Sequence, residues 1–196
     1  MAYIKNQHAY SLKNSKGGTA LDLSGYDGYS IIGFQPHGRS NQAWTFQQDD
    51  DKNGWFIRSS SGKYLGIEGN PQAGAAVVAV SNPFKWDVKD SDIENARGIR
   101  ILAHGTNFSL DLFKGNPANW TKIMLWGSWP GANQIWTFTE LVSIEDQRTY
   151  SLRDAPKESS KVFFFNFLSS PSHRAFFCDS KDLNLDLNAC FHPFLV

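Results

Sequence analysis

Two groups of polar residues in this chain have the composition of a site that binds hydroxyl groups. One group is Asp22 with the later pair Asn41-Gln42, and the other is Asp111 with the later pair Asn133-Gln134. A carboxylate accepts hydrogen bonds and a primary amide both donates and accepts them, so together they can fix two adjacent hydroxyls. The chemistry that suits this combination is the non-covalent recognition of a sugar.

Sugar recognition also needs an aromatic plate, because one face of a pyranose ring carries apolar C–H groups. Trp126, which follows the apolar run Ile123-Met124-Leu125, supplies this plate in the second group, and Trp129 is a secondary candidate for the rim. The corresponding candidates in the first group are Phe34, His37 and Gly38. His37 has a second interpretation, which is that it supports the loop and does not contact a ligand.

The elements that must position these groups repeat along the chain. Asn41-Gln42-Ala43-Trp44-Thr45-Phe46 returns as Asn133-Gln134-Ile135-Trp136-Thr137-Phe138, and Phe84-Lys85-Trp86-Asp87-Val88 is an eroded copy. Each copy follows a short apolar core, and the cores lie 44 and 45 residues apart. The centres of these cores are Asp22, Gly66 and Asp111. Self-similarity at a fixed period indicates one supersecondary unit used three times.

Each unit reads as four short strands separated by glycine-containing turns, with no stretch long enough for an amphipathic helix. In the first copy the expected strands are Tyr10-Ser11-Leu12-Lys13-Asn14, Ala20-Leu21-Asp22-Leu23, Ser30-Ile31-Ile32-Gly33-Phe34 and Ala43-Trp44-Thr45-Phe46. Three such copies predict a twelve-stranded all-β fold with threefold pseudosymmetry. Closing the sheet would remove its exposed edges.

The triplicated Gln-x-Trp signature resembles the β-trefoil of ricin-B-type lectins, and the run from Gly33 to Trp44 is similar to the version in small mushroom lectins. The resemblance covers about residues 5 to 142. It implies a non-catalytic lectin that binds galactose or N-acetylgalactosamine-type glycans through shallow pockets in the first and third repeats. The carbohydrate-binding residues expected from it are Asp22, Phe34, His37, Gly38, Asn41, Gln42, Asp111, Trp126, Asn133 and Gln134.

Several of these residues also have a purely structural interpretation. The two aspartates could cap turns, and Gln42 and Gln134 could satisfy the backbone. We expect Asp111 to lie in a surface pocket and to contribute little to the core. Arg39 departs from the His-Gly-Gly pattern of mushroom relatives, which leaves the sugar specificity open. The second copy has Gly66 in place of aspartate and Phe84-Lys85 in place of Asn-Gln, so we expect no such site there. Trp44, Trp86 and Trp136 are expected in the core.

Composition divides the chain into a β-trefoil domain at residues 1–142 and an extension at residues 143–196. All 16 glycines lie in the first part, whereas both cysteines, Cys178 and Cys190, lie in the second. The extension is expected to be poorly ordered, or else to dock a partner or touch a membrane. Its run Val162 to Leu168 is much shorter than the roughly 20 residues that cross a bilayer. The N-terminus lacks the apolar segment of a secretory signal, and the first part lacks cysteine, so we expect a cytoplasmic protein with free thiols.

Charge and motifs argue against several other functions. The 19 basic and 19 acidic residues balance without a basic cluster, whereas a nucleic-acid partner would require concentrated lysine and arginine. No phosphate-binding loop, nucleophile motif or metal-ligand spacing of histidines occurs. We therefore expect no catalysis, no cofactor and no metal.

Two alternatives from other classes remain. Unrelated trefoils inhibit proteases through long loops, and here the loop Asp49-Asp50-Asp51-Lys52-Asn53 would serve that purpose. The chain could instead be a non-enzymatic accessory subunit with vestigial sugar pockets. For the lectin hypothesis we expect a homodimer, because several weak sites gain avidity when they are linked.

Overall fold

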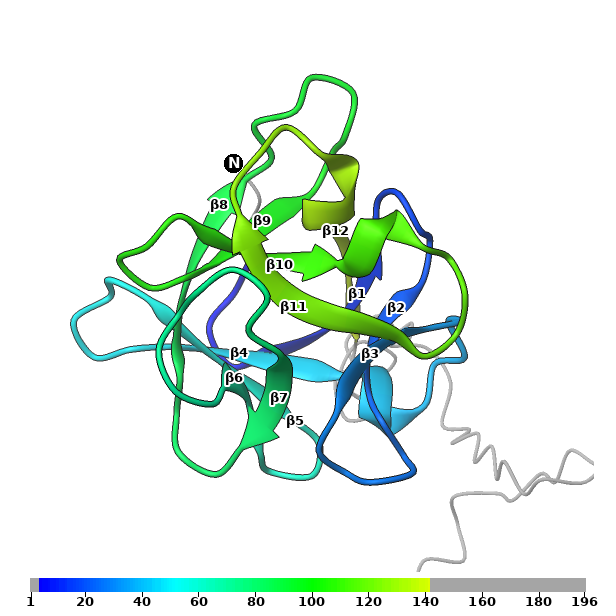
Figure 1. Ribbon diagram of the computed structural model, residues 1–196. Helices are drawn as coiled ribbons and strands as arrows, with labels where there is room; N and C mark the ends of the chain where they lie inside the picture. Colours follow the sequence, from blue (N-terminus) through cyan, green and yellow to red (C-terminus); the bar gives the residue numbers. More distant parts are fainter. Residues whose placement is uncertain (1–3, 142–196) are drawn as a thin grey trace, which may run out of the picture. The chain divides into compact units, whose positions relative to one another are not determined.

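The fold, given by a computed structural model that describes residues 4–141, is all-β and consists of three four-stranded repeats (Figure 1). The strands are β1 (His8–Asn14), β2 (Ala20–Leu23), β3 (Ile31–Phe34), β4 (Trp44–Gln48), β5 (Trp55–Ser59), β6 (Tyr64–Ile67), β7 (Val77–Val80), β8 (Lys85–Asp90), β9 (Ile99–Ala103), β10 (Phe108–Leu112), β11 (Thr121–Gly127) and β12 (Trp136–Leu141). The predicted β-trefoil with twelve strands is confirmed. The predicted extension at 143–196, with its cysteines, lies outside the described residues.

Six of the strands close into an antiparallel barrel. β1 pairs with β4 and with β12, and the ring continues through the pairs β4–β5, β5–β8, β8–β9 and β9–β12. Each barrel strand therefore has a neighbour on both sides, and no barrel edge is left to template aggregation. In the described part of the chain, no helix is both long enough and apolar enough to cross a membrane.

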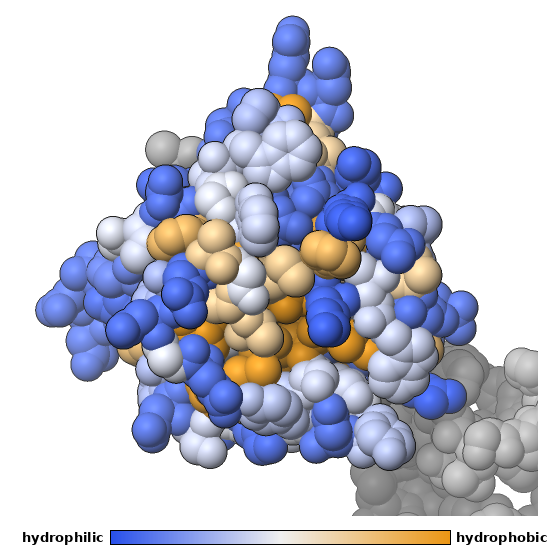
Figure 2. Space-filling model, in the orientation of Figure 1, coloured by the Kyte–Doolittle hydropathy of each residue, from blue (hydrophilic) through white to orange (hydrophobic). Residues whose placement is uncertain are grey.

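The other six strands form three hairpins, β2–β3, β6–β7 and β10–β11, which meet on the face turned to the viewer in Figure 1. Adjacent hairpins are joined through the pairs Lys122–Ile32, Ser30–Val78 and Ala76–Met124. Apolar side chains gather in the middle of this face (Figure 2). The three equivalent pairs define which residues correspond between the repeats.

The core is built around three equivalent tryptophans, each with 0% of its surface exposed. The indole N–H of Trp44 donates to the carbonyl of Leu21 (2.9 Å), that of Trp86 to Leu65 (2.9 Å), and that of Trp136 to Leu110 (3.2 Å). A buried indole N–H requires a partner, and here all three find the same one. The prediction that these tryptophans are core residues is confirmed.

The core role of Trp136 predicts that Trp136→Ala lowers the free energy of unfolding by about 3–5 kcal/mol, because it leaves a cavity and an unpaired Leu110 carbonyl. Trp126→Ala is the matched control, since 48% of Trp126 is exposed; it should cost about 1 kcal/mol or less. Urea unfolding of both variants measures the difference. Equal losses of unfolding free energy would contradict the assignment of Trp136 to the core and of Trp126 to the surface.

Candidate functional site

The first candidate site is organised around the carboxylate of Asp22, which lies on β2 and is 2% exposed. Its Oδ1 accepts a hydrogen bond from the amide of Asn41 (2.9 Å), and its Oδ2 accepts one from the amide of Gln42 (2.8 Å). Both amides belong to the short 3-10 turn η1 (Ser40–Gln42), which directly precedes β4. The predicted triad of Asp22, Asn41 and Gln42 is therefore brought together.

Gln42 links Asp22 to the backbone of the loop that precedes η1. Its Nε2 also donates to the carbonyl of Gln35 (3.0 Å), and its Oε1 accepts from the backbone N–H groups of His37 (2.9 Å) and Gly38 (3.4 Å). Gln42 is 2% exposed, and neither it nor Gly38 lines the pocket. The interpretation that this glutamine satisfies the backbone describes its contacts.

The pocket itself is a shallow hollow of about 280 Å³. Its lining is Asp22, Gly25, Tyr26, Ile32, Phe34, His37, Arg39, Asn41 and Trp120. Sequence reasoning identified Asp22, Phe34, His37 and Asn41, and it noted Arg39 only as a departure. It missed Trp120, because this residue belongs to the third repeat and reaches the first pocket only through the pairing of β11 with β3.

The ring of His37 lies beside the carboxylate. Its Nδ1 accepts a hydrogen bond from the backbone N–H of Arg39 (3.2 Å), so Nε2 carries the hydrogen and faces Oδ2 of Asp22 at 3.3 Å. Burial raises the pKa of Asp22 above its ordinary value of 3.8, although the hydrogen bonds from the amides of Gln42 and Asn41 oppose the rise. His37 thus both supports the loop and faces the pocket.

The third repeat reproduces this arrangement around Asp111 on β10. Its Oδ1 accepts from the amide of Asn133 (2.9 Å) and its Oδ2 from the amide of Gln134 (2.9 Å), both on η3 (Ala132–Gln134). Trp126 pairs with Ser109 as Phe34 pairs with Ala20, so the two aromatics occupy equivalent places. Burial raises the pKa of Asp111 as well. The expectation that Asp111 matters little to the folded core is wrong, because the residue is 4% exposed and holds two amides.

The residues that lie over the polar groups differ between the first and third sites. Trp129 stands where the first repeat has His37, and Gly131 stands where it has Arg39. The indole of Trp129 packs over Gly131 so closely that a Cβ on the glycine would lie 2.2 Å from the ring. Asn133 is only 3% exposed, and no donor in the described residues reaches its Oδ1. The polar centre of the third site therefore lies beneath Trp129.

A buried arginine completes the third site. Pro130 stands where the first repeat has Gly38, and proline has no N–H to offer the glutamine. Nη1 of Arg100 donates instead to Oε1 of Gln134 (2.6 Å), and its Nη2 pairs with Oδ1 of Asp92 (2.6 Å). Arg100 is 3% exposed. No sequence pattern indicated this residue, because it lies on β9, outside every repeated motif.

The second repeat contains an apolar contact where the other two have a carboxylate. A Cβ on Gly66 would lie 2.5 Å from a methyl of Val80 and 3.0 Å from Cβ of Phe84. Counted back from the core tryptophan, Pro83 and Phe84 replace the Asn-Gln pair, so the sequence alignment of Phe84-Lys85 with that pair was one residue out of step. Phe84 occupies the glutamine position and packs on Trp86.

Solved structures similar to this chain have the same fold. The ricin B-like lectin of Macrolepiota procera, solved in complex with lactose, is 42% identical, with a TM-score of 0.66, over 71% of this chain and 100% of that one. The Rhizoctonia solani agglutinin is 30% identical, with a TM-score of 0.65, over 72% and 100%. A designed threefold-symmetric protein, ThreeFoil, is 23% identical, with a TM-score of 0.59, over 68% and 99%, and supports the fold alone.

The profile of the ricin-type beta-trefoil lectin domain-like family matches residues 3–79 and 40–126. The overlapping matches agree with the internal repetition. A search of curated proteins found no match. The fold and the carboxylate–amide sites define a β-trefoil of the lectin type. The chain belongs to the ricin-type β-trefoil lectin domain-like family.

The position of Arg100 predicts that Arg100→Met destabilises the protein by about 1–3 kcal/mol, because Oε1 of the buried Gln134 loses its charged donor and keeps only the longer hydrogen bond from the backbone N–H of Trp129 (3.2 Å). Arg58→Met is the control, since Arg58 is exposed and donates to the Gly62 carbonyl at the surface; it should cost about 0.5 kcal/mol or less. Urea unfolding compares the two variants. Equal stabilities would show that Gln134 does not depend on the guanidinium.

Proposed function

We propose that this protein is a non-catalytic lectin that binds galactose or N-acetylgalactosamine-type glycans. The observation that carries the proposal is the twofold occurrence of one buried arrangement, a carboxylate held by two amides beside an aromatic ring, around Asp22 and around Asp111. Burying a carboxylate and its amides costs desolvation free energy in each of the two repeats. Turn capping alone does not require this burial. The second repeat keeps the core tryptophan without this geometry, so the fold does not need it.

The chemistry of the first pocket suits a sugar. Asn41 and Asp22 line the pocket together, and the Nδ2 of Asn41 donates to Oδ1 of Asp22 and to the carbonyl of Leu23. The amide oxygen and the carboxylate therefore offer acceptors to adjacent hydroxyls, and the guanidinium of Arg39, which lines the same pocket, offers donors. Phe34 lines the same hollow and offers a surface for the C–H face of the ring. The lactose bound by the similar lectin of Macrolepiota procera supports a galactose-type ligand.

The two pockets are proposed to differ in accessibility. The first is open, whereas a ligand of the third pocket has to displace the indole of Trp129 to reach Asn133. Displacement costs the packing over Gly131, so the first pocket is the stronger site. The proposed biological partner is a glycan presented on another molecule. We also propose that the protein is cytoplasmic and forms a homodimer.

The contacts of the Asp49 loop do not favour the protease-inhibitor alternative. The carboxylate of Asp49 accepts hydrogen bonds from the N–H groups of Asn53 (2.9 Å) and Gly54 (3.1 Å), and it pairs with Lys85. The segment between β4 and β5 is therefore a tight turn folded onto the barrel. It is not the long loop that the inhibitor hypothesis requires.

Single and double carboxylate variants test the function directly. Asp22→Ala and Asp111→Ala should each weaken lactose binding at their own site by about ten- to a hundredfold, since a hydrogen bond to a charged group is worth about 1.5–3 kcal/mol. Calorimetric titration should find no binding to the double variant. Because both aspartates are buried, the unfolding of each variant protein must be followed in parallel. Asn41→Ala is a milder change, in which Gln42 still donates a hydrogen bond to Asp22. Lactose binding that survives the double variant would overturn the proposal.

The raised pKa values of Asp22 and Asp111 predict an acid-sensitive affinity. A carboxyl with a raised pKa is protonated at a higher pH than an ordinary aspartate, whose pKa is 3.8. Lactose affinity should therefore begin to fall while the pH is still above 3.8. The fold should persist there, because Lys85 and Arg100 lower the pKa values of Asp49 and Asp92, and stability from these pairs is lost only below 3.8. Titration and thermal melting from pH 7 to pH 3 separate the two events. Simultaneous loss of binding and fold would contradict this order.

A further inference from the structure

Trp120 occupies a backbone position that strongly disfavours a tryptophan. It lies in the loop before β11 with φ +70°, in the left-handed region where a bulky side chain is strained. The hairpin pairs place Gly28 and Gly74 at the equivalent positions of the other repeats, with φ +60° and +84°. Glycine is the ordinary residue for this conformation. The third repeat alone carries a large aromatic there.

Hydrogen bonds and strand pairing join this loop to the first repeat. The hydroxyl of Thr121 donates to the carbonyl of Ala118 (2.7 Å), and the side-chain oxygen of Asn119 accepts from the backbone N–H of Gln35 (2.7 Å). Thr121 also pairs with Gly33 across the repeat boundary. The strained residue is thus fixed against the first repeat from both sides.

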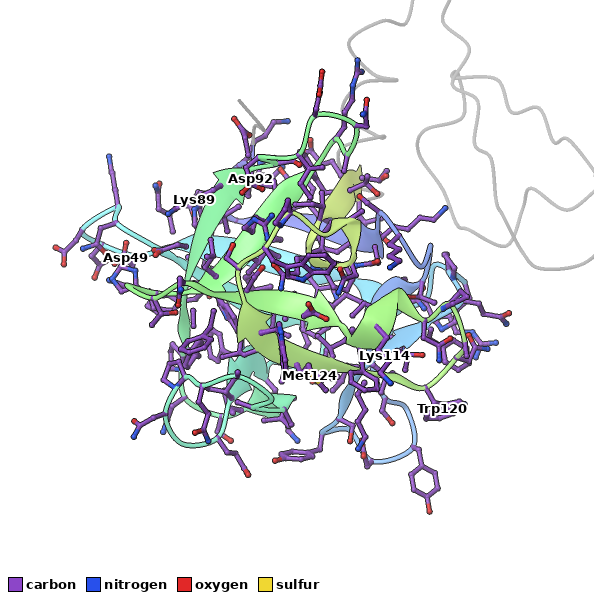
Figure 3. The ribbon with its side chains drawn as sticks, turned by 45° about the horizontal axis from the view of Figure 1, so that its top comes forward. Asp49, Lys89, Asp92, Lys114, Trp120 and Met124 are labelled. Carbon is purple, nitrogen blue, oxygen red and sulfur yellow. The ribbon has the colours of Figure 1, made fainter. Side chains whose placement is uncertain are left out.

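The side chain of Trp120 does not serve the core. It is 57% exposed, and in Figure 3 it projects outward at the edge of the domain. Its ring stands edge to face with Phe34, with centroids 5.5 Å apart and planes at 88°, and Phe34 in turn stands 5.8 Å from His37. The three rings form a series that leads outward from Asp22. Trp120 therefore adds a wall to the first pocket on the side away from the carboxylate.

We propose that Trp120 forms a second sugar subsite, in which its indole packs against the sugar unit linked to the galactose that Asp22 binds. This inference rests on the proposed lectin function and deepens it, because it makes the first pocket selective for a disaccharide or longer glycan over a free monosaccharide. An indole face suits the C–H surface of a sugar ring. Tyr26, which lines the same pocket and is 91% exposed, is available to border the same subsite.

The third pocket supplies an internal comparison. The residue equivalent to Trp120 there is Gly74, whose added Cβ would lie 3.9 Å from the ring of Trp126. Gly74 has no side chain to form the wall, so the third pocket lacks this second subsite. Disaccharide selectivity therefore belongs to the first pocket alone.

The test uses the full chain with Asp111→Ala in the background, so that only the first pocket titrates, and it compares galactose with lactose. Trp120→Gly restores the glycine of the other repeats and removes the backbone strain, so the variant should melt no lower than its parent. We expect it to weaken lactose binding about three- to tenfold more than galactose binding, and Trp120→Phe should keep part of the preference.

The outcomes separate the two proposals. The thermal melt of the parent first establishes that Asp111→Ala leaves it folded. If the folded parent binds neither sugar, the lectin function for galactose-type ligands fails and the subsite fails with it. If the parent binds both sugars and Trp120→Gly leaves their ratio unchanged, or weakens both equally, the subsite alone is overturned. A selective loss of lactose affinity with an unchanged melting temperature supports it.

Discussion

The hydrogen bond from each core indole to a leucine carbonyl determines where the polar sites of this protein can form. Leu21 directly precedes Asp22, and Trp44 follows Gln42 by two residues, so the bond between Trp44 and Leu21 brings the glutamine amide to the aspartate. The third repeat repeats this relation between Trp136 and Leu110. The second repeat keeps the bond between Trp86 and Leu65 without the polar groups. The bond therefore belongs to the fold, and the pockets are additions to it.

Repetition explains why so much of the fold could be predicted from the sequence. Leucine, tryptophan and the 44- to 45-residue period indicate a threefold core without any knowledge of the pairing. The Asp–Asn–Gln groups could be predicted for the same reason, since they lie at fixed positions relative to those core residues. The error at Phe84 arose where a copy had diverged: only the tryptophan of the motif remains there, and the pair was placed directly before Trp86 although one residue separates Gln42 from Trp44.

The residues that escaped prediction act across repeat boundaries. Trp120 completes a pocket of another repeat, and a local pattern cannot reveal a contact made between hairpins far apart in the chain. Arg100 escaped because it compensates for a missing backbone donor at Pro130, which is visible only once the hydrogen bonds of Gln134 are known. The strand pairing places Ser11 at the corresponding position of the first repeat, where Gly38 supplies the N–H and no such compensation is needed.

The pairing of β1 with β12 gives the barrel no obligatory starting point. Ala9 lies opposite Leu141, so the first and last strands of the described residues are neighbours in the same ring as every other pair. The turn between Gln48 and Trp55 joins β4 to β5 in the same antiparallel manner. A circular permutant that connects β12 directly to β1 and opens the chain within residues 49–54 would retain every strand pair of the barrel. The order of the three repeats along the chain is thus a matter of connectivity, and the two pockets would be assembled from the same neighbours in either order.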